Sequence, residues 1–238
     1  MRNGLAICLS VIVTLSFASS AWSQNPITAD SPFQIRYFSN LNLADSVINI
    51  TNSGANGNMT GNICANVYVF SPDEQMAACC SCLVTPNALV SLSVRNDLIS
   101  NTLTPAVPNS VVVKLVSTLA PAGGSCNATK VLAPDPLVPG LLAWGTTFHQ
   151  QTTTITVPNT SSTCKTYCQG GYPQYASWCN TYCPARTQTT TSSAVTETPF
   201  SPATLSAGEL FVLTDRCTDI QQDGSGFGIC KSCRLGGQ

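Results

Sequence analysis

The chain is organised around residues 63–87, ICANVYVFSPDEQMAACCSCLVTPN. A strand-like run over 63–70 is followed by a polar bend at 71–74 and then by a cluster of cysteines. Four cysteines lie in this short stretch: Cys64, Cys79, Cys80 and Cys82. Such density is typical either of a metal or redox centre or of a knot of structural disulfides. The remainder of the chain distinguishes these two interpretations.

The N-terminus has the pattern of a secretory signal peptide. Residues 1–3 provide a basic start, the run 5–17 an apolar centre, and residues 18–23 a small-residue cleavage site. We predict a signal peptide over residues 1–23, cut after Ser23. No later stretch reaches the roughly 18 to 20 apolar residues that a membrane span requires. The sequence therefore predicts export, with no membrane span in the mature chain.

Charged residues are scarce. The chain has 10 basic and 11 acidic residues, which make up 9% of its length. Nucleic-acid binding needs clustered Lys and Arg, so we expect no nucleic-acid partner. The abundance of Thr, Ser, Asn and Gly favours strands joined by polar turns over an ion-paired helical bundle. We predict a single β domain over residues 24–238.

The cysteine count favours disulfides over a metal site. Of 13 cysteines, Cys8 lies in the predicted signal peptide, which leaves an even number in the exported chain. Structural zinc sites usually combine two close cysteine pairs or a pair with His, and His149 is the single histidine. We expect Cys79, Cys80 and Cys82 to lie in a bend and to reach different parts of the domain. Adjacent Cys79 and Cys80 should point in different directions and bind separate elements, with Cys126, Cys217 or the tail pair as candidate partners. The predicted disulfide cysteines are Cys64, Cys79, Cys80, Cys82, Cys126, Cys164, Cys168, Cys179, Cys183, Cys217, Cys230 and Cys233.

A Thr-rich segment, residues 150–195, has a symmetrical cysteine pattern. Threonine runs at 152–157 and 187–192 enclose two Cys-x3-Cys pairs. Reflection through a turn near Pro173 brings the outer cysteines together and the inner cysteines together, as in two antiparallel arms. We therefore predict the disulfides Cys164–Cys183 and Cys168–Cys179, at the tip of a projecting hairpin insertion. A three-residue gap suits a helical turn as well as a strand, so the conformation of the tip stays open.

The other predicted elements are strands and one helix. Asn56-Gly57, a typical hairpin turn, suggests that strands 46–52 and 61–70 form a long hairpin. Ser206 and Glu209 form a capping box at the start of a helix that ends at the Gly-rich segment 223–226. Further strands are predicted at 33–37, 88–94, 110–116 and 141–149, of which 110–116 should be central and buried on both faces. The predicted fold is a mainly β, antiparallel sandwich with many disulfides and one C-terminal helix.

Catalytic and cofactor patterns are weak. His149 is the only imidazole that could act as a base, and no Gly-x-Ser-x-Gly elbow accompanies it. Cys230-x-x-Cys233 lies in a tail rather than at the helix start that redox pairs favour. The acidic series Asp215, Asp219 and Asp223 lacks a calcium-loop pattern and fits a solvated helix face. We predict no catalytic residue, no metal site and no cofactor.

Aromatic residues gather in the predicted arm. Exposed aromatics on a rigid tip make good contacts for a protein or a sugar, whereas mutually packed rings would form a miniature core. The sequence leaves both interpretations open for the arm aromatics Tyr167, Tyr172, Tyr175, Trp178 and Tyr182. The candidate ligand contacts are Trp144, Tyr172, Tyr175 and Trp178.

Five motifs recur in one group of proteins: Cys64-Ala65-x2-Tyr68-Val69-Phe70, Gln75-Met76-x2-Cys79-Cys80-x-Cys82, Val84-Thr85-Pro86-Asn87, Leu92-Ser93 and Leu205-Ser206-x2-Glu209. With these motifs the chain resembles secreted, cysteine-rich proteins of uncharacterised function from soil bacteria of the acidobacterial type. The Thr-rich arm looks like an insertion relative to that group. The resemblance implies export and a bacterial origin, and it brings no activity or ligand.

These observations predict a non-enzymatic protein that is secreted or attached to the cell envelope. Its role would be structural or adhesive, with another extracellular protein, a second copy or a polysaccharide as partner. The alternatives are a carbohydrate- or peptide-binding module that uses the arm aromatics, and an exported hydrolase.

Overall fold

The cysteine-rich stretch folds as a β-hairpin. In the computed structural model, β3 (Ile63–Phe70) pairs with β4 (Met76–Val84) in antiparallel register from Ile63 opposite Val84 onward. A turn between Ser71 and Gln75 joins the two strands, as expected of the polar bend. The cysteine cluster itself was expected to lie in a bend, and this prediction is wrong because Cys79, Cys80 and Cys82 all lie within β4.

The structure describes residues 31–54, 61–103, 106–123, 125–131, 137–170 and 172–233. The predicted signal peptide, residues 1–23, and the Asn56-Gly57 turn lie outside these ranges. Among the described residues, no helix is long and apolar enough to cross a membrane.

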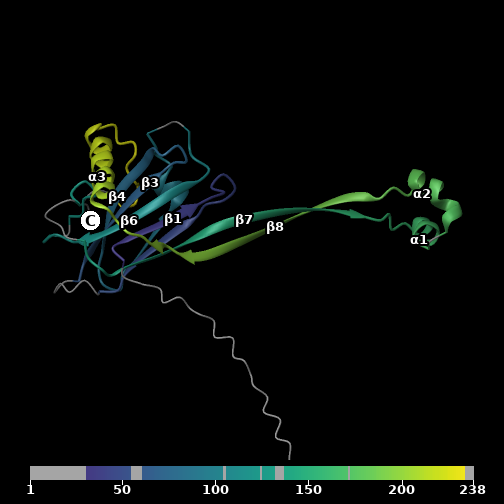
Figure 1. The fold of residues 1–238 in the computed structure, drawn as a ribbon, viewed down its shortest axis with the longest axis horizontal. Coiled ribbons are helices and arrows are strands. Elements are labelled where there is room, and N and C mark those ends of the chain that lie inside the picture. The colour runs from purple at the N-terminus through teal and green to yellow at the C-terminus, as the bar shows by residue number, and fades with distance from the viewer. Residues whose placement is uncertain are drawn as a thin grey trace, which may run out of the picture.

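Two antiparallel sheets make up the body and the arm. The five-stranded sheet has the order β4-β3-β6-β1-β9, and the four-stranded sheet has the order β5-β2-β7-β8. The fold class is therefore confirmed as mainly β, with two sheets, one C-terminal helix and a projecting hairpin (Figure 1). The remaining strands are β1 (Phe33–Phe38), β2 (Val47–Asn52), β5 (Leu89–Ser93), β6 (Val111–Leu119), β7 (Leu141–Val157), β8 (Arg186–Pro199) and β9 (Ser201–Pro202).

The predicted hairpin between 46–52 and 61–70 is wrong. β2 pairs with β5 and β7, whereas β3 pairs with β4 and β6 in the other sheet. The connection crosses from one sheet to the other, which allows the apolar faces of both strands to pack in the core between the sheets. Ile48 and Ile50 of β2 belong to the same buried cluster as Val67 of β3, so both strands contribute to the core between the two sheets.

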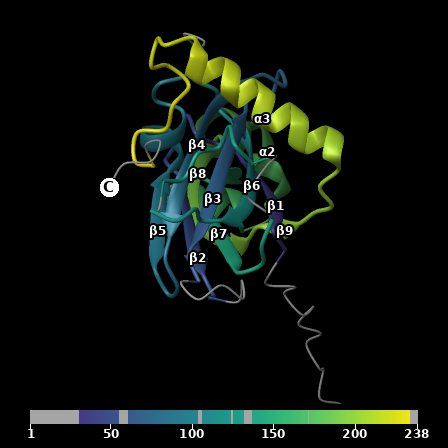
Figure 2. The ribbon, with the colours of Figure 1, turned by 90° about the vertical axis from the view of Figure 1, so that its left-hand side faces the viewer.

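A second core lies on the opposite face of the five-stranded sheet. There α3 (Ala207–Gln222) covers the sheet, and Leu213 and Ile220 pack with Tyr68 and Val116 (Figure 2). On this face α3 helps to cover Tyr68 and Phe70, and Cys64 packs with Ala120 and Cys126, so that every residue of β3 is buried. The prediction for 110–116 is also confirmed, since β6 is the middle strand of its sheet and is buried or half-buried throughout.

The predicted start of α3 is confirmed. The Ser206 hydroxyl accepts a hydrogen bond from the Glu209 backbone N–H at 3.0 Å, which caps the helix. The Glu209 side chain pairs with Lys114 of β6 instead of returning to the cap. Gly224, with φ of 67°, follows the last turn as the Gly-rich stop predicted.

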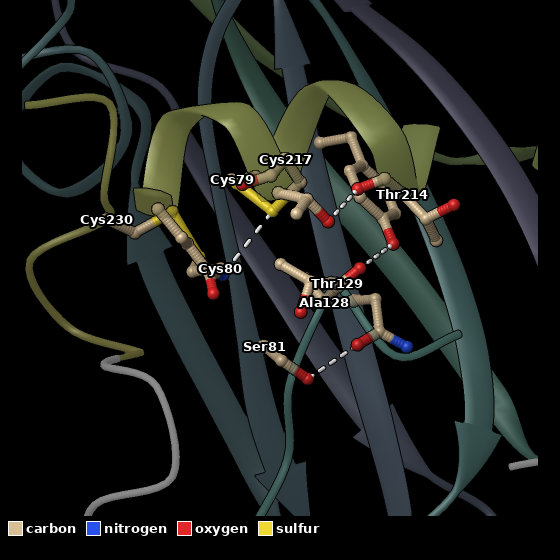
Figure 3. The surroundings of a disulfide bond; sticks show 12 residues. Cys79, Cys80, Ser81, Ala128, Thr129, Thr214, Cys217 and Cys230 are labelled. Carbon is tan, nitrogen blue, oxygen red and sulfur yellow. Dashed lines mark hydrogen bonds between the residues drawn. A yellow bond between two sulfur atoms is a disulfide. The ribbon is translucent and has the colours of Figure 1, made fainter. Parts of the chain in front are cut away.

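Strand geometry decides which disulfides the cysteine cluster forms. Successive residues of a strand point to opposite faces, so Cys79 faces α3 and bonds Cys217 there (Figure 3). Cys80 and Cys82 point to the other face and bond Cys230 and Cys233 of the C-terminal tail. The prediction that Cys79 and Cys80 bind separate elements is confirmed, and Cys64 bonds Cys126.

One further element of the body was not predicted. The strand expected over 88–94 ends at Ser93, and Val94–Leu98 form a π-helical turn. Asp45 accepts hydrogen bonds from the Ser93 hydroxyl and the Arg95 backbone N–H, which holds this turn against the body.

Candidate interaction surface

The arm is a two-stranded ribbon that extends the four-stranded sheet away from the body (Figure 1). β7 pairs with β8 from Trp144 opposite Pro199 to Val157 opposite Arg186, without a shift of register. The strand predicted at 141–149 and the threonine run 152–157 of the predicted arm form the single strand β7. Since an extended chain rises about 3.3 Å per residue, the part of β7 from His149 outward spans roughly 30 Å.

Both faces of the ribbon meet solvent. All residues of β8 are exposed, and so are those of β7 from His149 to Thr156. A hairpin of two strands is marginally stable alone, so its cross-strand pairs matter. Threonine faces threonine at several successive positions, and such β-branched pairs suit a ladder. These pairs are Thr152 with Thr191, Thr153 with Thr190, Thr154 with Thr189 and Thr156 with Thr187.

Arg36 of β1 anchors the base of the arm. Its guanidinium donates to the carbonyl oxygens of Thr198 and Pro199 on β8 and to the Thr147 hydroxyl on β7. It also lies 4.9 Å from the centroid of the Phe38 ring. Arg36 is buried, and this burial lowers the pKa of the guanidinium. The arm is therefore bonded to the body through both of its strands, by a residue that sequence reasoning did not single out.

Two short helices form the tip. α1 (Ser162–Cys168) and α2 (Ala176–Tyr182) are each seven residues long, with a 3-10 turn at Pro173–Tyr175 before α2. The predicted disulfides Cys164–Cys183 and Cys168–Cys179 are both confirmed. Their spacing of four residues places both cysteines of each Cys-x3-Cys pair on one side of a helical turn. The tip, whose conformation the sequence left open, is a disulfide-stapled helical hairpin.

The tip aromatics contact one another and still meet solvent. Ring centroids lie 5.1 Å apart for Tyr167 and Tyr175, 6.3 Å for Tyr167 and Trp178, and 5.5 Å for Trp178 and Tyr182. These separations are typical of favourable ring pairs. Tyr182 nevertheless keeps 66% of its surface exposed and Tyr172 keeps 51%, while Trp178 is half-buried. The rings therefore combine both interpretations: a mutually supported cluster that is presented outward.

The chemistry of the tip is apolar and neutral-polar. Residues 158–185 contain no Asp or Glu. Lys165 is the cationic side chain within this segment, and Arg186 belongs to the strand pair that adjoins the tip. Among the described residues, none offers a hydrogen bond to the hydroxyls of the four tip tyrosines. The tip can thus provide aromatic faces together with free phenol hydroxyls. We call the five rings the aromatic tip: Tyr167, Tyr172, Tyr175, Trp178 and Tyr182.

The structure separates Trp144 from the other predicted ligand contacts. Tyr172, Tyr175 and Trp178 lie together in the aromatic tip, whereas Trp144 is half-buried in the body, opposite Asn49 of β2. The strand between Trp144 and the end of β7 is roughly 40 Å long at about 3.3 Å per residue. Trp144 is therefore not part of the same surface, and its contact role stays a prediction.

The other residues considered for chemistry have ordinary surroundings. His149 is exposed, and its Nε2 lies 2.8 Å from the Thr196 hydroxyl across the ribbon. Asp215, Asp219 and Asp223 lie on exposed positions of α3 and at its C-terminal end. Within the described ranges, no group of His, Cys, Asp and Glu side chains is arranged to hold a metal ion.

Comparison with protein-family models, with curated proteins and with solved structures finds no match for this chain.

Proposed function

We propose that this chain is an exported, non-enzymatic interaction protein of the cell exterior, in which a disulfide-stabilised body holds the aromatic tip out to a partner. The observation that carries this proposal is the exposed arm with five ring-packed aromatics at its end. Six disulfides support export, because such bonds persist in oxidising compartments.

The tip suits binding because it is rigid before any partner arrives. Tyr and Trp contribute large contact areas with few rotatable bonds, and ordering them in advance lowers the entropy lost on binding. Here two disulfides and several ring contacts already order the side chains. Binding hot spots are enriched in Trp and Tyr, which makes Trp178 and Tyr182 the main expected contributors.

A second candidate function is carbohydrate binding by the same tip. Its support is the absence of carboxylates from residues 158–185 together with free tyrosine hydroxyls beside exposed rings. Aromatic faces cover the apolar faces of sugars, and hydroxyls can bond to their polar edges. The chemistry favours an uncharged polysaccharide over a polycation or a polyanion.

The test compares the intact protein with a tip-replacement variant. In this variant, Asn-Gly joins Val157 to Arg186 in place of residues 158–185, because this dipeptide closes a two-residue hairpin and the two flanking residues are the last pair of the ladder. Retention is measured on cellulose, on chitin and on bacterial envelope fractions before and after protease treatment. A protease-sensitive partner supports the interaction role, and retention on the polysaccharides supports the carbohydrate role.

Single substitutions locate the contact. Tyr182→Ala should weaken retention several-fold, whereas Tyr37→Ala, which removes a ring of the body with 59% exposure, should leave it unchanged. Undiminished retention of the tip-replacement variant on every surface that holds the intact protein would refute the proposal, and so would the lack of any retention.

A further inference from the structure

The outer backbone edge of β8 is open along most of the arm. β8 is the last strand of its sheet and pairs only with β7 among the described strands. At the base, Arg36 donates to the outward-facing carbonyl oxygen of Pro199, and the following residues Ser201–Pro202 pair with β1, which closes that end of the edge. The unpaired edge therefore runs from Arg186 to Glu197, a length of roughly 40 Å at about 3.3 Å per residue.

This edge lacks the features that usually prevent pairing with another strand. Natural edge strands carry prolines, bulges, inward-pointing charges or a covering element. The segment 186–197, RTQTTTSSAVTE, has neither Pro nor Gly, and its register with β7 contains no bulge. Its only charges are at its two ends, and between them lie ten residues dominated by Thr, which has high strand propensity.

We propose that β8 of a second copy of this chain pairs with this edge in antiparallel orientation, so that two arms form one four-stranded ribbon. A strand-forming segment of about the same length can cover the edge, and the uncharged residues 187–196 of β8 in a second copy provide one. A two-fold axis perpendicular to the ribbon would pass near Thr191 and Ser192, the middle of the open edge.

The charges at the ends of the edge select the antiparallel orientation. Antiparallel pairing brings Arg186 of each copy to the end where Glu197 of the other copy lies. Parallel pairing in register would instead place Arg186 against Arg186 and Glu197 against Glu197, and like charges across a ladder are destabilising. Arg186 and Glu197 are separated by an odd number of positions, so their side chains point to opposite faces of the ribbon. The charges therefore act by disfavouring the parallel pairing and not by forming an ion pair.

The arrangement has a functional consequence that goes beyond the tip contact. In the antiparallel pair, the tip of one copy lies beside the arm base of the other, and the two aromatic tips point in opposite directions. The pair is then bivalent and can bridge two partner surfaces. When both tips bind the same surface or assembly, the overall affinity is higher than that of one tip alone. The added pairing also stabilises a ribbon that has solvent on all sides.

The experiment measures the oligomeric state of the disulfide-bonded protein by sedimentation over a wide range of concentrations. The intact protein should show a concentration-dependent monomer–dimer equilibrium. The variant Thr189→Lys/Thr191→Lys puts like charges at the two-fold axis and should raise the dimer dissociation constant about tenfold or more, which corresponds to at least about 1.4 kcal/mol.

The matched control is Thr152→Lys/Thr154→Lys. These threonines lie directly opposite Thr191 and Thr189 on β7, so the control adds the same charge to the same ribbon but away from the β8 edge. It should dimerise like the intact protein, and so should the tip-replacement variant, which separates this inference from the tip contact. A protein that stays monomeric throughout, equal weakening by both lysine pairs, or loss of the dimer on tip replacement would overturn the proposal.

Discussion

The tip should unfold on its own when its two disulfides are removed. α1 and α2 have seven residues each, fewer than the about 12 to 15 that an isolated helix needs. The disulfides close loops with sequence separations of 19 and 11, and the chain-entropy relation assigns about 3 kcal/mol to each. The ring pairs that remain contribute only about 1 kcal/mol each, so they do not compensate. Alanine at Cys164, Cys168, Cys179 and Cys183 should therefore leave the tip unfolded.

The body should keep its thermal stability in this four-alanine variant, because the exposed ribbon separates it from the tip. The assay uses the fluorescence of Trp178, isolated by Trp144→Phe, since the remaining tryptophan, Trp22, lies in the predicted signal peptide. Emission should shift to longer wavelength as the half-buried indole becomes solvated, while Tm of the body stays within error of the intact protein.

A matched control removes a disulfide of the body. Cys79→Ala/Cys217→Ala cuts the bond between β4 and α3, whose sequence separation of 138 corresponds to about 5 kcal/mol by the same relation. This variant should lower Tm of the body and leave the Trp178 emission unchanged. Native Trp178 emission in the four-alanine variant, or a clearly lower unfolding temperature of its body, would contradict this prediction.

Three further outcomes are expected. Arg36→Met should cost about 1 to 3 kcal/mol, because the acceptors at the arm base lose their donor, and hydrogen exchange should rise at Thr198 but not in the tip. Burial raises the pKa of Tyr68 above its ordinary value of 10.0, so the folded state keeps a proton that the unfolded state releases. The free energy of unfolding should then be independent of Tyr68 below about pH 10 and fall as the pH rises further. Tyr68→Phe should flatten this fall, and it should cost about 1 kcal/mol at neutral pH because the 2.7 Å hydrogen bond to the Ala128 carbonyl is lost. Urea unfolding measures both effects. Reduction should unfold the body and EDTA should leave its Tm unchanged, because the clustered cysteines are joined in disulfides; a fall of Tm with EDTA alone would contradict this.

Local symmetry made the tip predictable. The spacing of Cys164, Cys168, Cys179 and Cys183 carries the whole connectivity, because only one nested pairing is compatible with two arms that face each other. The helical conformation was not predictable in the same way, since a spacing of four suits a helical turn and also an extended arm. Strand alternation likewise separates Cys79 from Cys80, but only once β4 is known to be a strand.

The pairing of strands that are far apart in the chain was less predictable from the sequence. Asn56-Gly57 favours a hairpin locally, yet β2 and β3 belong to different sheets because Ile48 and Ile50 need cover from the opposite face. Such a requirement depends on partners far along the chain. Arg36 was missed for a similar reason: its sequence signal is a single charge within the apolar run FQIRYF, and its meaning depends on carbonyl groups at Thr198 and Pro199.

The continuity of β7 links the body to the tip mechanically. Its first residues pair with β2 in the body, and its last residues lead directly into the stapled helices. A load applied at the tip along the arm would therefore act parallel to β7, so that the hydrogen bonds to β2 and β8 share it in shear instead of opening one by one. Arg36 bonds both strands where this load enters the body. A tip that binds a partner surface needs such an attachment, whereas a flexible insertion that served only as a linker would not.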